Sequence, residues 1–86
     1  MTIIKAIEDK VQTFGAELHG NRVLIPEVLQ DHKELSWGAK GLFITITGPF
    51  FGTCHRSDLE RLGPSLDELD QCLDELVDAG FVEVEG

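Results

Sequence analysis

The feature that most constrains the fold is a stripe of apolar residues near the end of the chain. Its members recur at spacings of three and four residues, the period of a helix that buries one face. They are Leu66, Leu69, Leu73, Leu76 and Val77. Ser65 and Glu68 form a capping-box pattern after Pro64, and Gly80 is the type of residue that follows a last helical turn. The sequence therefore predicts one helix between Ser65 and Gly80.

The outward face of this predicted helix is acidic. The last 25 residues contain eight of the sixteen acids and no lysine, arginine or histidine, so they hold nearly all of the net charge of -9. The polar residues of the helix are Asp67, Glu68, Asp70, Gln71, Asp74, Glu75 and Asp78. Binding to DNA depends on lysine and arginine, and base reading on those residues with asparagine and glutamine. Only Gln71 is a candidate base reader, and the face is predicted to repel DNA.

The distribution of these acids also disfavours the helix itself. Asp74, Glu75 and Asp78 lie towards its C-terminal end, where the helix dipole disfavours each anion by roughly 0.3–1 kcal/mol. Asp70–Asp74 and Asp74–Asp78 are like-charge pairs one turn apart. A solvated helix face is the plain alternative for such a run of charge. We expect instead that the surface is kept acidic for a partner, or to keep DNA away.

The middle of the chain predicts a strand and then a helix. Residues 22–26 form a short β-rich run ended by a proline, and residues 27–34 a polar connection. Ser36 is a suitable cap for a helix over residues 37–47, which Gly48 and the proline after it end. The side chains expected to be buried along this helix are Trp37, Leu42, Phe43 and Ile46.

Three further elements complete the second half of the prediction. Residues 50–52 form an apolar loop expected to fold back onto the core, and residues 55–62 a helix with Leu59 and Leu62 facing inward. Residues 81–85 alternate apolar and acidic, which predicts a half-buried strand beginning at a buried Phe81.

Residues 1–22 fit two structures. Apolar residues at helical spacing favour an amphipathic helix: Ile3, Ile4, Ile7, Val11 and Phe14. Residues 2–7 are also rich in β-branched side chains, and residues 11–18 suit a strand. A turn at residues 19–21 fits both. We favour extended structure for this N-terminal extension.

The order of the predicted elements, strand, helix, short helix, tight turn, long helix and strand, is that of a winged helix. Residues 25–31 and 35–42 add a proline-led start, an aspartate, a leucine–serine helix start and an alanine–lysine–glycine–leucine helix. They resemble the N-terminal winged helix-turn-helix domains of phage and plasmid replication-initiator-like proteins and bacterial transcriptional regulators. Residues 63–65 and the leucine helix that leads into residues 79–82 resemble the turn, recognition helix and start of the wing.

This resemblance implies a single α+β domain over residues 1–86, with a three-helix core and short strands. Such domains usually bind DNA. A DNA-binding regulator of replication or transcription is therefore one hypothesis, with phosphate contacts from Lys40, His55, Arg56 and Arg61. One copy offers few contacts, so this hypothesis needs a dimer. Pairing between the edges of a first or last strand in two copies is one route to it.

The acidic face supports a different hypothesis. A non-enzymatic regulatory or adaptor module binds a basic protein surface through the recognition-helix face, in the manner of a DNA mimic, because opposite charge steers the encounter. The predicted contact residues are the seven polar residues of that helix. Charge reversal there is expected to weaken capture of the partner and flatten its dependence on salt.

Other kinds of function lack support in the sequence. Cys54 and His55 are the one nucleophile–base pair adjacent in sequence, but neighbours in a strand point to opposite faces. No glycine-rich phosphate loop and no metal-ligand spacing are present, so we expect no enzymatic activity, cofactor or metal. Free cysteines and the lack of a leader or a bilayer-length apolar run predict a cytoplasmic protein.

Overall fold

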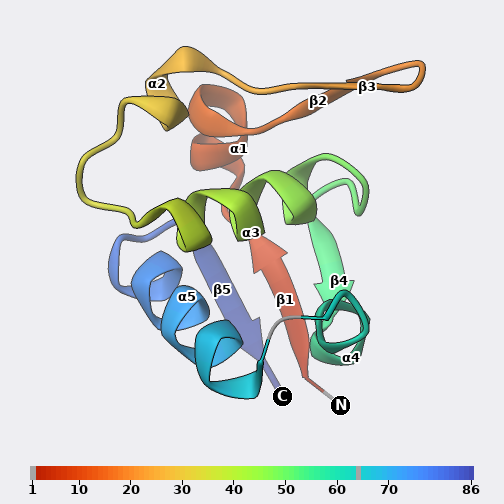
Figure 1. Cartoon of the computed structure of the whole chain (residues 1–86), viewed down its shortest axis with the longest axis vertical. Helices are drawn as coiled ribbons and strands as arrows, with labels where there is room; N and C mark the ends of the chain where they lie inside the picture. Colours follow the sequence, from red (N-terminus) through yellow and green to blue (C-terminus); the bar gives the residue numbers. More distant parts are fainter. Residues whose placement is uncertain (1, 64) are drawn as a thin grey trace.

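The computed structural model describes residues 2–63 and 65–86, so Pro64 of the predicted turn lies outside the described residues. The chain forms a small α+β fold with two antiparallel sheets (Figure 1). In chain order the elements are β1 (Ile3–Ala6), α1 (Glu8–Phe14), β2 (Glu17–His19), β3 (Arg22–Leu24), α2 (Glu27–Gln30), α3 (Trp37–Thr47), β4 (Thr53–His55), α4 (Arg56–Glu60), α5 (Leu66–Asp78) and β5 (Val82–Glu85).

The main sheet has the order β4-β1-β5, so the first strand of the chain lies at its centre. Ile4 is opposite Cys54 on one side and Val84 on the other, and both pairings are antiparallel. Edge pairing between copies through the first strand is wrong, because both edges of β1 are already occupied within the chain. The last strand, β5, lies at an edge of the sheet, so the route predicted through it stays a prediction.

The helices cover this sheet and enclose the core with it. α3 crosses the sheet and packs on β1 and β4, while α5 lies along α3 and β5 (Figure 1). The largest fully buried side chains come from all of these elements: Ile4, Leu29, Phe43, Ile46, Leu59, Leu69, Leu76, Phe81 and Val82. The rings of Phe43 and Phe81 meet edge to face with centroids 5.1 Å apart, a favourable geometry for aromatic pairs.

Local sequence signals explain the ends of the two long helices. The Ser36 side chain accepts a hydrogen bond from the backbone N–H of Ala39, as predicted for the start of α3. After α5, the N–H of Phe81 bonds the carbonyl of Leu76, and the N–H of Gly80 bonds that of Val77. Gly80 has a φ of +78°, which a glycine adopts without strain, so a Schellman-type end turns the chain into β5.

The N-terminal extension contains both of the structures considered for it. Extended structure is correct for β1 and β2, but wrong for residues 8–14, which form α1. Val11 and Phe14 of α1 pack against the core at helical spacing, the pattern that favoured a helix in this part of the sequence. The predicted polar connection also contains the short helix α2, whose Leu29 is buried.

Several predicted inward-facing residues are exposed. Trp37 is 77% exposed, because it lies in the first turn of α3 beyond the edge of the core, and Leu62 is 58% exposed, because α4 ends two residues earlier. Leu66, Phe51 and Val77 are likewise exposed, whereas Phe50 packs on the core as expected. The predicted helix over residues 55–62 is shorter, and β4 precedes it.

The second sheet is a hairpin of β2 and β3 that extends away from the rest of the molecule (Figure 1). Arg22–Leu24 confirms the strand predicted over residues 22–26. Gly20, with a φ of +63°, lies in the two-residue turn, where a positive φ matches the twist of the strands. Every residue of both strands is exposed.

Candidate functional site

α5 is held by its apolar face, which leaves its acidic face outward. Leu69, Leu73 and Leu76 are at most 5% exposed, and the Ser65 side chain accepts a hydrogen bond from the N–H of Glu68. The predicted helix and its predicted serine cap are therefore confirmed. Of its seven polar residues, six are exposed and Glu75 is half-buried.

Two of the seven predicted contact residues have partners within the chain. Asp70 forms an ion pair with Arg56 at the start of α4, and both side chains reach solvent. A surface ion pair of this kind contributes at most about 1 kcal/mol. It joins α4 to α5 and reduces the free charge of the acidic face by one.

Glu75 has a structural role that the sequence does not reveal. Its two carboxylate oxygens accept hydrogen bonds from the backbone N–H of Ser36 at 3.0 Å and from the Ser36 hydroxyl at 2.7 Å. The carboxylate thus lies at the N-terminus of α3, where the helix dipole favours an anion. The contact with α3 offsets the unfavourable effect of an anion near the end of α5, and the predicted contact of Glu75 with a partner stays a prediction.

The remaining acids of α5 form a surface that is not neutralised by basic side chains of the same chain. Among residues 2–63 and 65–86, no ion pair involves Asp67, Glu68, Asp74 or Asp78. With Gln71, these side chains are exposed along one helix. We call Asp67, Glu68, Gln71, Asp74 and Asp78 the acidic face.

The four basic residues proposed for DNA contact lie in different surroundings. Lys40 is 7% exposed, and its ammonium donates to the carbonyl of Gln30 at 2.7 Å, so it is not available at the surface. Arg56 is paired with Asp70, and His55 is partly buried at the start of α4. Arg61 is exposed, and the phosphate contacts predicted for the residues other than Lys40 stay a prediction.

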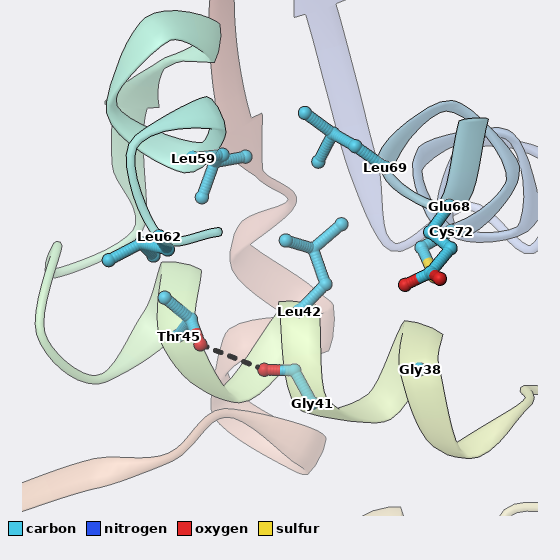
Figure 2. A pocket seen from close by; sticks show the side chains of 9 residues that line it. All are labelled: Gly38, Gly41, Leu42, Thr45, Leu59, Leu62, Glu68, Leu69 and Cys72. Atoms are coloured by element: carbon cyan, nitrogen blue, oxygen red, sulfur yellow. Dashed lines mark hydrogen bonds between the residues drawn. The ribbon is translucent and has the colours of Figure 1, made fainter. Parts of the chain in front are cut away.

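An apolar groove lies beside the acidic face, where α3, α4 and α5 meet (Figure 2). Its volume is about 210 Å³. Side chains of Leu42, Leu59 and Leu69 project into it from the three helices, and Leu62 lies at its mouth. The Thr45 hydroxyl donates to the carbonyl of Gly41 at 3.0 Å, so it is satisfied within α3.

The α5 side of this groove carries one charged residue. Glu68 and Cys72, one helical turn apart, both line it. By helical spacing, Asp67, Asp74 and Asp78 point away from this side of α5. The groove is therefore apolar with a single acid at its border, and most of the acidic face lies elsewhere on the helix.

A second hollow of about 190 Å³ lies on the other side of α3 and is lined by Ile25, Ile44 and Trp37. The Lys40 ammonium is 4.6 Å from the centroid of the Trp37 ring, which places a cation against the aromatic face. Trp37, which the sequence predicted to be buried, is thus an exposed aromatic residue beside this hollow, and exposed aromatic residues of this kind are enriched at interfaces.

Both cysteine thiols are held in the protonated form. Burial, with a smaller contribution from Asp58, raises the pKa of Cys54 from 9.0 to about 11. Burial, and then the charges of Glu75 and Glu68, raise the pKa of Cys72. Since the thiolate is the nucleophilic form, Cys54 and His55 do not make an activated pair at neutral pH.

No cluster of three histidine, cysteine or carboxylate side chains is placed to hold a metal ion in the described part of the chain. Within residues 2–63 and 65–86, no helix has the length and apolar content to cross a bilayer.

Comparison with known proteins adds no relative: no family model, no curated protein and no solved structure matches this chain.

Proposed function

We propose that this protein is a non-enzymatic adaptor or regulator that binds a basic protein surface through the acidic face of α5. The observation that carries the proposal is the absence of ion pairs at Asp67, Glu68, Asp74 and Asp78 within the described residues. Their mutual repulsion is relieved when a cationic partner approaches, and the same field accelerates the encounter.

The order of elements supports a winged-helix origin for this module. α3, α4, α5 and β5 follow one another in the expected order, and β4 adds a strand between α3 and α4 that pairs with β1. In this proposal α5 occupies the position of a recognition helix but carries anions. It acts in the cytoplasm by occupying a basic groove that nucleic acid otherwise fills.

The test uses a variant with Asp67, Asp74 and Asp78 all replaced by lysine. Asp70 and Glu75 stay unchanged, because their contacts with Arg56 and Ser36 contribute to the fold. The wild-type protein is expected to capture a discrete set of basic proteins from lysate at low salt. Capture should weaken steeply as salt rises, because exposed charges are screened within about 10 Å at 0.1 M.

A matched control carries the same change of net charge elsewhere, with Glu8, Glu27 and Glu34 replaced by lysine. All three are exposed and lie outside α5. The control should keep the captured set, and the α5 variant should lose it. Equal capture by both variants contradicts the proposal, as does a shift of duplex DNA by the wild-type protein at low salt.

A further inference from the structure

Lys40 is a buried cation that has no anionic partner in the described part of the chain. It is 7% exposed, and the ion pairs of residues 2–63 and 65–86 join Glu17 to His19 and Asp70 to Arg56. A lysine is almost never fully buried in a protein unless it is paired, because water solvates an ammonium better than an apolar interior does. An anion from outside the chain would therefore lower the cost of burying Lys40.

The Lys40 ammonium keeps hydrogen-bonding capacity after its contacts within the chain are counted. It has three N–H donors, and one of them bonds to the carbonyl of Gln30 at 2.7 Å. The ring of Trp37, with its centroid 4.6 Å away, attracts the positive charge but does not replace a carboxylate acceptor. Among the described residues the ammonium donates no other hydrogen bond. A donor is thus left for an acceptor outside the chain.

The second hollow beside α3 gives such an acceptor access to the ammonium. Lys40, Gln30 and Trp37 all line this hollow of about 190 Å³, so the cation lies at its wall. The rest of the lining is apolar or small: Ile25, Leu29, Gly41 and Ile44. Lys40 is the charged residue of this lining, and α5 contributes nothing to it. The hollow therefore combines an apolar interior with one positive charge.

The dimensions of the hollow restrict its ligand to a small molecule. An apolar cavity of about 150 Å³ accommodates benzene, whereas drug-sized ligands need roughly 300–1,000 Å³. A hollow of about 190 Å³ therefore fits one ring, or a branched chain of similar size, together with one small polar group.

The charges restrict that polar group to a singly charged anion. Phosphate sites in proteins use several donors, such as an arginine fork or the N–H groups at the start of a helix. Here one ammonium is present, and Gln30 is the last residue of α2, so this helix turns its carbonyl end towards the ammonium. The net charge of -9 further disfavours multiply charged anions. A carboxylate carries one charge and accepts strong hydrogen bonds from lysine.

We infer that the hollow between α2 and α3 binds a small carboxylic acid with an apolar body of about one ring. The carboxylate accepts a hydrogen bond from the Lys40 ammonium, and the apolar body lies between Trp37 and Ile44. The site shares no residue with the acidic face of α5, so it goes beyond the proposed function and is tested independently of it.

The test uses phenylacetate and three molecules that each change one of its features. Phenylacetamide has the same shape without the charge, and acetate has the charge without the ring. A tetrapeptide that ends in phenylalanine attaches the ring and the carboxylate to a longer chain. Trp37 is the one tryptophan of the sequence, so its fluorescence reports binding in the hollow. Amide chemical shifts of Lys40, Gly41 and Ile44 locate the site separately.

Phenylacetate should change both signals saturably and bind at least roughly tenfold tighter than phenylacetamide or acetate. Equal binding by phenylacetamide overturns the role of the charge, and equal binding by acetate overturns the apolar body. Tighter binding by the tetrapeptide assigns the hollow to the C-terminus of a protein and overturns the small-molecule ligand. No saturable change with phenylacetate at tens of millimolar overturns the whole inference.

Two variants separate the ammonium from the walls of the hollow. Lys40→Met keeps the length of the side chain without its charge, so it should bind phenylacetate no more tightly than phenylacetamide. Ile44→Phe fills part of the hollow and should weaken binding of both molecules. Lys5→Met removes the same charge at an exposed position of β1, so it is the matched control and should bind as the wild type does. Unchanged phenylacetate binding by either of the first two variants, in folded form, contradicts the inference.

Discussion

The two long helices are built on opposite plans. α5 is two-sided, with three of its four leucines buried and six acids among its other positions. α3 has one charged residue and is apolar or small elsewhere. Each begins at a serine cap. α5 takes its orientation from its own pattern, while α3 is fixed by contacts with the sheet and with α5. Sequence periodicity therefore specifies α5 more fully than α3.

The largest expected effect is a difference in stability loss between alanine substitutions at two aromatic residues of α3. Phe43→Ala should lower the free energy of unfolding by about 3–5 kcal/mol, because Phe43 is fully buried against Phe81. Trp37→Ala should change it by no more than about 1 kcal/mol, because the ring is 77% exposed and packs mainly against the Lys40 ammonium, which keeps its hydrogen bond to Gln30. Urea denaturation measures both. Similar losses would mean that α3 buries a different face.

Removing the two serine caps should destabilise the protein by different amounts, because the Ser36 side chain also connects α3 to α5. Ser65→Ala removes a single cap bond, at a cost of about 1 kcal/mol. Ser36→Ala should cost about 2 kcal/mol, because the hydroxyl both accepts from Ala39 and donates to the Glu75 carboxylate. Thermal unfolding of the two variants and of Ser36→Ala with Glu75→Gln tests the coupling. Additive losses in the double variant would show that the two residues act separately.

Replacing each of the two glycines of α3 by alanine should change the free energy of unfolding differently. Gly41→Ala is expected to raise the free energy of unfolding by about 1 kcal/mol, since Cβ has open space. Gly38→Ala should lose this gain, because Cβ would lie 2.9 Å from the Cys72 Sγ atom. Combining it with Cys72→Ala should restore the gain. If Gly41→Ala and Gly38→Ala are equally stable in chemical denaturation, the close contact of α3 with α5 does not require glycine at residue 38.

The smallest effect concerns the thiol between the helices. Burial, then Glu75 and Glu68, raise the pKa of Cys72, so its contribution to stability is full below pH 9.0 and declines as the pH rises through the folded-state pKa. Glu68→Gln removes one of these charges and should speed alkylation of Cys72 at pH 8.5 severalfold. Cys54, with a pKa of about 11, serves as the slow internal reference in the same mass spectrum. An unchanged Cys72 rate would exclude an influence of the acidic face on the thiol.

The sequence predicted α5, its cap and its final turn because each depends on a local signal. The bounds of α3 were also predictable from Ser36 and Gly48. The exposure of Trp37 and Leu62 was not, because it depends on where the core ends in space. For the same reason, the contact of Glu75 with Ser36, 39 positions away, had no signature in α5 itself.

The candidate site was predictable in composition but not in arrangement. The charge of α5 is visible in the sequence, and the pairing of Asp70 with Arg56 is not. The apolar groove was missed because its residues come from three helices and include two glycines. The position of Lys40 beside the second hollow is likewise visible only once its neighbours are known.

The central position of β1 has a consequence for biosynthesis. Ile3 pairs with Glu85, so during synthesis β1 acquires its second neighbour only after β5, far along the chain, has been made. Pairing between such distant segments carries a large loop-closure entropy and slows folding. A nascent chain with all its helices complete still has an open sheet, and this interval is when a chaperone or an unwanted strand has access to it.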